Sequence, residues 1–118
     1  MKLLHIIVCS AMILATISSD VQAHGYLVSS FPSAKVHLKT PPHKIKLRFS
    51  LRADAHYSTI DLESEDGSVL ATKNQPKASR EMAMDAPVLT PGRYRLRYRI
   101  LSPDGDLVRG KIVFFVDE

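Results

Sequence analysis

Arginine and apolar residues alternate without a break over residues 93–100, in the order Arg93-Tyr94-Arg95-Leu96-Arg97-Tyr98-Arg99-Ile100. Successive side chains of a β-strand point to opposite faces, and equivalent positions recur about every 6.8 Å. The spacing therefore predicts a half-buried strand, with the aromatic and aliphatic residues facing a core and the four arginines facing water.

The same period of two recurs in residues 44–49 and 58–63, and the mostly apolar residues 111–116 are typical of a closing strand that is largely buried. Turn-forming residues separate these segments, namely Pro41-Pro42, Asp66-Gly67, Asn74-Gln75-Pro76, Pro91-Gly92 and Pro103-Asp104-Gly105. No helical period of useful length is present. Short strands joined by such turns predict an all-β fold, an antiparallel β-sandwich.

Charged residues occupy the solvent-facing positions of three of the expected strands. Besides the arginines of residues 93–99, these are Lys44, Lys46 and Arg48 on one strand, and Asp61, Glu63 and Glu65 on another. Opposite charges on neighbouring strands pair for roughly 0.2–1 kcal/mol each. One interpretation is a solvated face with cross-strand ion pairs, and the alternative is a docking face for an acidic partner or an anionic lipid.

Length and composition point to one folded domain. The chain has 118 residues, of which 45% are hydrophobic and 24% charged, and these values are close to globular averages. Sixteen Lys plus Arg against 12 Asp plus Glu give a net charge of +4. This excess allows attraction to anionic surfaces but is too small for a nucleic-acid-binding arm, so no nucleic acid partner is expected.

The N-terminus has the pattern of a secretory signal peptide. Lys2 precedes an apolar run over residues 3–17, and Val21 and Ala23 form a small-x-small ending. The run is shorter than the roughly 20 residues of a membrane span, although a retained N-terminal anchor remains an alternative. We expect residues 1–23 to be removed and residues 24–118 to form one exported, periplasmic domain. Because Cys9 is the only cysteine, that domain would contain no disulfide.

Cleavage after Ala23 would give His24 a free α-amine beside its imidazole. Copper readily displaces the protons of both groups near neutral pH, and nitrogen ligands in a tetragonal arrangement suit Cu(II). The alternative is that His24 is an ordinary residue that happens to follow the cleavage point.

Residues 91–110 resemble the C-terminal signature of the CopC-type periplasmic copper-resistance proteins. That signature consists of a Pro-Gly-x-Tyr strand, a later aromatic residue, a Ser-x-Asp-Gly-His turn and a Gly before the last strand. Residues 24–32 are similar to the opening of the family, a His followed by a short strand and a Ser-x-Pro turn, and residues 47–50 match its Leu-x-Phe-Ser strand end. The resemblance covers essentially all of residues 24–118.

The resemblance implies a seven-stranded Greek-key, immunoglobulin-like sandwich that carries or buffers Cu(II) and is not an enzyme. Its ligands would be the amine and imidazole of His24, the carboxylate of Asp104 and a second His. Here Asp106 stands in place of that second His, and Leu51 stands where the family often has an acidic residue. The resemblance also implies an inner-membrane copper transporter as a partner.

We therefore take His24, Asp104 and Asp106 as the candidate copper ligands. A carboxylate in place of an imidazole is expected to lower Cu(II) affinity and to weaken discrimination against Zn(II) or Mn(II). Alternatively, residues 104–106 form only a turn, in which Asp bonds its own backbone and Gly supplies a positive φ.

Other possible metal ligands are few. Some family members carry a Met-rich Cu(I) site, but only Met82 and Met84 remain in residues 24–118, and core packing is the favoured interpretation for them. His37, His43 and His56 are expected in loops at the surface. His56 is the one placed to replace the missing imidazole.

Two further functions compete with copper carriage. A relative that has lost its metal would persist as an interaction domain. The start His24-Gly25-Tyr26 also looks like copper monooxygenases, but residues 24–118 leave little room for a substrate platform, and no second His is assigned. No nucleophile–base pair or phosphate-cradling Gly loop is found, so no small-molecule substrate is expected.

Overall fold

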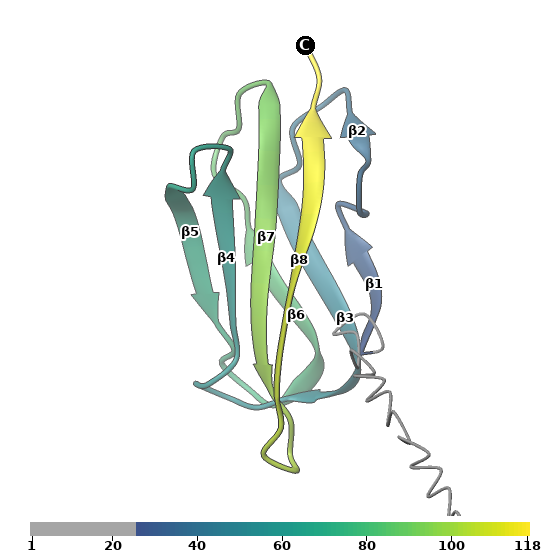
Figure 1. Cartoon of the computed structure of the whole chain (residues 1–118), viewed down its shortest axis with the longest axis vertical. Helices are drawn as coiled ribbons and strands as arrows, with labels where there is room; N and C mark the ends of the chain where they lie inside the picture. The colour runs from purple at the N-terminus through teal and green to yellow at the C-terminus, as the bar shows by residue number, and fades with distance from the viewer. Residues whose placement is uncertain (1–25) are drawn as a thin grey trace, which may run out of the picture.

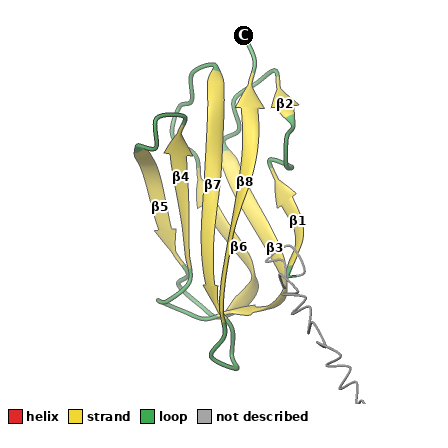
Figure 2. Ribbon diagram, in the orientation of Figure 1, coloured by secondary structure: helices red, strands yellow, loops and turns green. Residues whose placement is uncertain are grey.

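The computed structural model describes residues 26–118 as two β-sheets packed face to face (Figure 1). The eight strands are β1 (Leu27–Phe31), β2 (His37–Leu38), β3 (Lys44–Ala53), β4 (Thr59–Ser64), β5 (Val69–Asn74), β6 (Ser79–Asp85), β7 (Gly92–Leu101) and β8 (Leu107–Val116). One sheet has the order β1-β3-β6 and the other the order β2-β8-β7-β4-β5. Loops connect the strands, and the described residues contain no helix (Figure 2).

The predicted all-β sandwich is confirmed, with one difference in detail. Seven strands have five or more residues, and β2 adds an eighth of only two residues. β2 pairs with the end of β8 in parallel, so the sandwich is not antiparallel throughout. This pairing forms because the backbone of residues 35–38 runs beside β8, where the amide of Lys35 donates to the carbonyl of Val113.

The core lies where the alternating segments point inward. Ile45, Leu47 and Phe49 of β3 face the second sheet and are buried. From the other side, β7 contributes buried Tyr94, Leu96, Tyr98 and Ile100. Burying a side chain of this size contributes about 1.5–3 kcal/mol, so the alternation accounts for much of the stability of the sandwich.

The sequence does not predict β5 as a strand, because its residues do not alternate between apolar and polar side chains. Five of its six positions are exposed, and the strand lies at the edge of the five-stranded sheet. The strand is held by backbone pairing with β4, where Thr59 lies opposite Asn74 and Asp61 opposite Thr72. An edge strand of this kind depends on its neighbour and carries little hydrophobic signal of its own.

The acidic row expected on the third strand is shorter than the sequence indicated. Asp61 and Glu63 lie in β4, directly opposite Arg97 and Arg95 of β7. Glu65 lies beyond the end of β4, in the turn to β5, because the chain already reverses at Asp66-Gly67. Glu65 therefore takes no part in the cross-strand pairing. No helix among residues 26–118 has the length and apolar character needed to span a membrane.

Candidate metal centre

The chain enters the sandwich at one end of the β1–β3 pair. His24 lies outside the described residues, and Tyr26 is the first residue that the structure describes. The amide of Ser50 donates to the carbonyl of Tyr26 at 2.7 Å, and Leu27 pairs with Phe49. The start of β1 therefore lies beside the last residues of β3.

Three loops lie at this same end, namely residues 54–58, 75–78 and 102–106 (Figure 1). The amide of Asp54 donates to the carbonyl of Leu101 at 2.9 Å, and the amide of Leu101 donates to Ser58 Oγ at 3.1 Å. The first loop is therefore tied to the end of β7, immediately before the loop that carries Asp104 and Asp106.

Ser102 holds loop 102–106 together. Its side chain is buried, and its Oγ accepts the amide of Asp106 at 3.1 Å. Its own amide donates to the carbonyl of Asp106 at 2.8 Å, and its carbonyl accepts the amide of Gly105 at 3.0 Å. Gly105 has a φ of 85°, a left-handed conformation that glycine adopts at little cost. The loop is therefore a closed turn with a defined shape.

The carboxylates of Asp104 and Asp106 project from this turn into solvent. Both residues are exposed, and neither side chain makes a hydrogen bond or an ion pair with any residue in the described part of the chain. The hydrogen bonds that close the turn come from Ser102 and the backbone, and not from the aspartate carboxylates. The two carboxylates are therefore chemically available to a cation.

The turn at Asp66-Gly67 shows the opposite arrangement. There the Asp66 carboxylate accepts hydrogen bonds from the Ser64 hydroxyl and from the amide of Ser68. The Ser64 hydroxyl, followed by Ser68, lowers the pKa of Asp66 to about 2. The interpretation of an Asp that bonds its own turn thus describes Asp66, whereas at residues 104–106 only the positive φ of the glycine is observed.

The remaining histidines lie in different parts of the sandwich. His56 is exposed in loop 54–58, at the same end as Asp104, with a φ of 73° and its amide bonded to the carbonyl of Gln75. His37 was expected in a loop but lies in β2, paired with the end of β8, where Nδ1 is 2.9 Å from Asp117 Oδ1 and the ring stacks on Phe115. His43 immediately precedes β3, at the end away from loop 102–106.

Asp54 is a candidate that the sequence reasoning missed. It lies in the loop after β3, and its backbone is bonded to Leu101, so the tertiary structure brings it near the candidate turn. Leu51, which stands where the family often has an acidic residue, packs against the core instead. The signal for Asp54 was its place at the end of an alternating strand, three residues after Leu51.

Within residues 26–118, no group of three or more His, Cys, Asp or Glu side chains is arranged to hold a metal ion. Asp104, Asp106 and His56 therefore do not complete a site by themselves. The predicted set of His24, Asp104 and Asp106 depends on His24, which the structure does not describe. That set stays a prediction.

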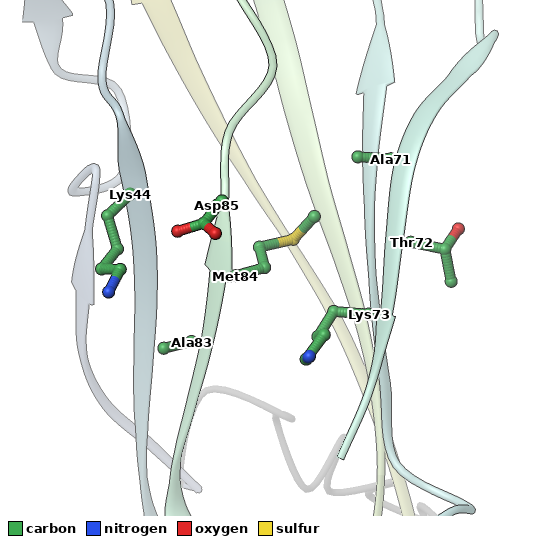
Figure 3. A pocket seen from close by; sticks show the side chains of 7 residues that line it. All are labelled: Lys44, Ala71, Thr72, Lys73, Ala83, Met84 and Asp85. Carbon is green, nitrogen blue, oxygen red and sulfur yellow. The ribbon is translucent and has the colours of Figure 1, made fainter. Parts of the chain in front are cut away.

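The two methionines are core residues, as the sequence indicated. Met82 and Met84 are only 1% and 5% exposed. Met84 also borders a recess of about 380 Å³ between the edges of the two sheets, where its thioether points toward β5 (Figure 3). The other residues that line this recess are Lys44, Ala71, Thr72, Lys73, Ala83 and Asp85. None of them is a soft ligand for Cu(I).

Comparison with known proteins gives consistent matches. The profile of the CopC domain matches residues 27–117. Protein YobA from Escherichia coli K12 is 25% identical over 104 residues, which cover 85% of this chain and 84% of YobA. YobA from Shigella flexneri matches with the same identity and the same coverage of both chains.

Solved structures share the fold as well. The crystal structure of CopC from Methylosinus trichosporium OB3b superposes with a TM-score of 0.71 and 39% identity, over 78% of this chain and 92% of that one. PcoC from Escherichia coli, a methionine-rich copper resistance protein, superposes with a TM-score of 0.66 and 29% identity, over 78% and 97% of the two chains.

Proposed function

This chain belongs to the CopC family, and on that basis we propose that it is a periplasmic copper-resistance protein that binds Cu(II) and carries or buffers it. One observation carries the proposal. The carboxylates of Asp104 and Asp106 are exposed and free of hydrogen bonds within the described residues, on a turn closed by Ser102 at the end where β1 begins.

We propose that removal of residues 1–23 supplies the nitrogen ligands. His24 would then contribute its amine and its imidazole. Two residues of extended chain reach about 7 Å, so His24 is restricted to the neighbourhood of Tyr26 and therefore to this end of the sandwich. Together with Asp104 and Asp106, the set would comprise two nitrogens and two carboxylate oxygens.

This ligand set suits a carrier. Cu(II) accepts mixed nitrogen and oxygen ligands, but carboxylates also suit Zn(II) and Mn(II). We therefore expect weaker affinity and weaker selectivity than an additional imidazole would give. Because Asp104 and Asp106 lie on the surface, a bound ion would remain accessible for transfer, and we propose an inner-membrane copper transporter as the recipient.

The test compares the exported protein that begins at His24 with a version that has one extra glycine before His24. Cu(II) affinity is measured by competition with a chelator, and nitrogen coordination by electron paramagnetic resonance. We expect the extension to weaken binding at least about tenfold, or about 1.4 kcal/mol, and to reduce the number of coordinated nitrogens. Equal affinities and spectra would remove the amine from the site.

One variant with a matched control tests the Asp104 carboxylate. Asp104→Asn is expected to weaken Cu(II) binding, because the neutral amide is a poorer ligand. Asp85→Asn is the matched control, since Asp85 is an exposed carboxylate on β6 at the other end of the sandwich. The control is expected to bind like the unmodified protein. If both variants bind like the unmodified protein, Asp104 is not a ligand.

A second candidate function is a CopC-like interaction domain without metal. Two residues favour it, because Asp106 replaces an imidazole of the family pattern and Leu51 lies against the core in place of an acidic side chain. This function predicts no site-bound Cu(II) on the protein that begins at His24. The same titration therefore separates the two candidates.

A further inference from the structure

The outer face of the β7–β8 hairpin is strongly basic. We call this surface the β7–β8 basic face, and its residues are Arg93, Arg95, Arg97, Arg99, Arg109 and Lys111. These side chains share one face because they alternate with the buried residues of the same two strands. The face lies on the outside of the five-stranded sheet, away from the core.

Neighbouring carboxylates neutralise only part of this charge. Glu63 lies between two arginines, with Oε1 at 2.9 Å from Arg97 Nε and Oε2 at 3.5 Å from Arg95 Nη1. Asp61 accepts a hydrogen bond from the Thr72 hydroxyl at 2.7 Å and forms no ion pair within the described residues. On the basic face, four cations form no ion pair with any carboxylate of residues 26–118, namely Arg93, Arg99, Arg109 and Lys111.

The register of the hairpin places like charges against each other. Arg99 lies directly opposite Arg109. Arg97 lies directly opposite Lys111. Like charges at directly opposed positions destabilise a sheet. Two such pairs in succession therefore oppose folding.

The other sheet avoids this arrangement. On its outer face Lys44 lies opposite Asp85, and Arg48 lies opposite Glu81. Both sheets therefore present basic strands to solvent. In the five-stranded sheet, carboxylates lie across from the β7 arginines only on the β4 side, whereas on the β8 side Arg97 and Arg99 lie across from cations. The repulsion across β7 and β8 has no structural benefit within the described fold, whereas an anionic surface bound there would relieve it.

The basic face also contains a shallow recess of about 260 Å³. Its lining residues are Thr59, Asp61, Arg97, Tyr98, Arg99, Arg109 and Gly110. The Tyr98 side chain is turned into the core, whereas the three arginines are exposed. One guanidinium group can donate two parallel hydrogen bonds to two oxygens of a phosphate. A recess bordered by three guanidinium groups therefore suits a phosphate group.

The surroundings favour a lipid surface over a protein partner. The exposed large apolar residues of the described chain are Val28, Phe31, Tyr57, Val69, Leu70, Val88 and Leu107. Only Leu107 belongs to β7 or β8, and it is the first residue of its strand. The half-buried Val113 and Phe115 also lie on this face, opposite Arg95 and Arg93. No aromatic residue of β7 or β8 lies on it beside Arg97, Arg99, Arg109 and Lys111, whereas protein interfaces commonly bury aromatic anchors together with arginines. A charged bilayer needs no such anchor.

We propose that the β7–β8 basic face docks the exported protein on a lipid bilayer that carries anionic phosphate headgroups. Each basic residue near such a surface strengthens binding about fivefold, or about 1 kcal/mol, and salt screens the attraction. The four cations without ion pairs thus give a reversible, salt-sensitive attachment. The attachment uses no copper ligand and is independent of the proposed metal site.

The test measures binding of the metal-free exported protein, starting at His24, to vesicles. The vesicles contain either phosphatidylglycerol with phosphatidylcholine or phosphatidylcholine alone, at low and at high salt. We expect binding to the anionic vesicles at low salt and its loss at high salt. Equal binding to both vesicle types, or binding to neither, overturns the proposal and leaves an acidic protein as the alternative partner.

Two triple variants localise the effect. Arg99→Gln/Arg109→Gln/Lys111→Gln removes three charges from the basic face, and Lys44→Gln/Lys46→Gln/Arg48→Gln removes three from the other sheet. We expect the first to weaken vesicle binding about 100-fold, by about fivefold per charge, and the second to weaken it far less. Equal losses mean that only net charge matters, which overturns the assignment to this face.

Two controls complete the design. Thermal unfolding checks that both triple variants fold, and the first is expected to be at least as stable as the unmodified protein because it removes like-charge pairs. Inorganic phosphate is compared with chloride at equal ionic strength as a competitor. Stronger displacement by phosphate is expected because the recess suits a phosphate group, and equal displacement by the two salts overturns the role of the recess.

Discussion

The phenol of Tyr98 on β7 lies over Gly110 on β8, its direct partner in the hairpin, and a Cβ at position 110 would overlap the hydroxyl and the ring. Phe49 meets the Tyr98 ring edge-on, with centroids 5.4 Å apart. The hydroxyl is buried and has no hydrogen-bond partner in the part of the chain that the structure describes. Burial raises the pKa of Tyr98. Gly110 is therefore required for space, whereas Gly105 is required for its backbone angle.

Gly110→Ala is expected to destabilise the protein by about 1–3 kcal/mol, the usual cost of forcing an extra methyl into a packed core. Tyr98→Phe is expected to be neutral or stabilising, because it removes a buried hydroxyl that has no partner among residues 26–118. Chemical denaturation measures both. In a Tyr98→Leu background, Gly110→Ala should lower the free energy of unfolding much less. An unchanged loss of stability would show that the overlap with Tyr98 is not the cause.

Glu63→Gln is expected to lower stability by about 1–2 kcal/mol, because the carboxylate accepts a charged hydrogen bond from Arg97 and forms an ion pair with Arg95 while its own side chain is only 10% exposed. Asp61→Asn is the matched control on the same strand, since Asp61 contacts Thr72 and forms no ion pair within the described residues. Urea denaturation should show the larger loss for Glu63→Gln. Equal losses would mean that the ion pairs contribute nothing specific.

Asp106→His is expected to strengthen Cu(II) binding at least about tenfold, or about 1.4 kcal/mol, because an imidazole nitrogen replaces a carboxylate oxygen. Electron paramagnetic resonance should show an additional nitrogen ligand. The same substitution at Asp66, whose carboxylate is bonded within its own turn at the other end of the sandwich, is the control and should leave affinity unchanged. If the two substitutions have the same effect, position 106 is not at the site.

Ser102→Ala is expected to cost about 1 kcal/mol of stability, because the amide of Asp106 loses the buried hydroxyl that accepts its hydrogen bond. Ser102 acts here as a positioning residue. We also expect weaker Cu(II) binding with unchanged ligand atoms, which calorimetry and the spectral parameters would report together. Ser33→Ala, which removes an exposed serine hydroxyl bonded to the Ser30 carbonyl, should alter neither. A lower stability with unchanged affinity would show that the turn does not position the ligands.

Asp66 contributes stability that depends on pH. Its pKa in the folded state is lowered to about 2, below the value near 3.9 of an unfolded chain. The contribution is therefore present above about pH 4 and disappears as the pH falls through about 2. Asp66→Ala should be less stable than the unmodified protein at neutral pH, and the difference should shrink over that range. Thermal unfolding against pH, with metal-free Asp104→Ala as the control, tests this, and a difference independent of pH would contradict it.

The sequence was informative wherever a property repeats locally. The alternation in residues 93–100 and 44–49 correctly assigned strands and their inward faces, because the period of two is a property of one strand and needs no partner. Met82 and Met84 were assigned to the core on a different ground, because methionine commonly fills gaps in a core. The alternation did not predict β5, because this exposed edge strand does not alternate and forms only through its pairing with β4.

The candidate site was likewise predicted in part from the sequence and in part only from the structure. The resemblance to the CopC-type proteins pointed to Asp104 and Asp106, and the prediction of His24 depended in addition on a cleavage pattern. The sequence does not distinguish the turn at Asp66-Gly67 from the one at Asp104-Gly105. Only the structure shows that Ser64 and Ser68 occupy the first carboxylate, while Ser102 closes the second turn and leaves its carboxylates exposed.

The amino-acid order by itself determined the faces of the strands, the positions of the turns and the likeness to one family. The tertiary structure decided which strands became neighbours, and therefore that Arg99 meets Arg109 while Glu63 meets Arg95 and Arg97. The physical reason is that a face follows from the geometry of one strand, whereas register and charge partners arise from contacts between segments distant in the chain.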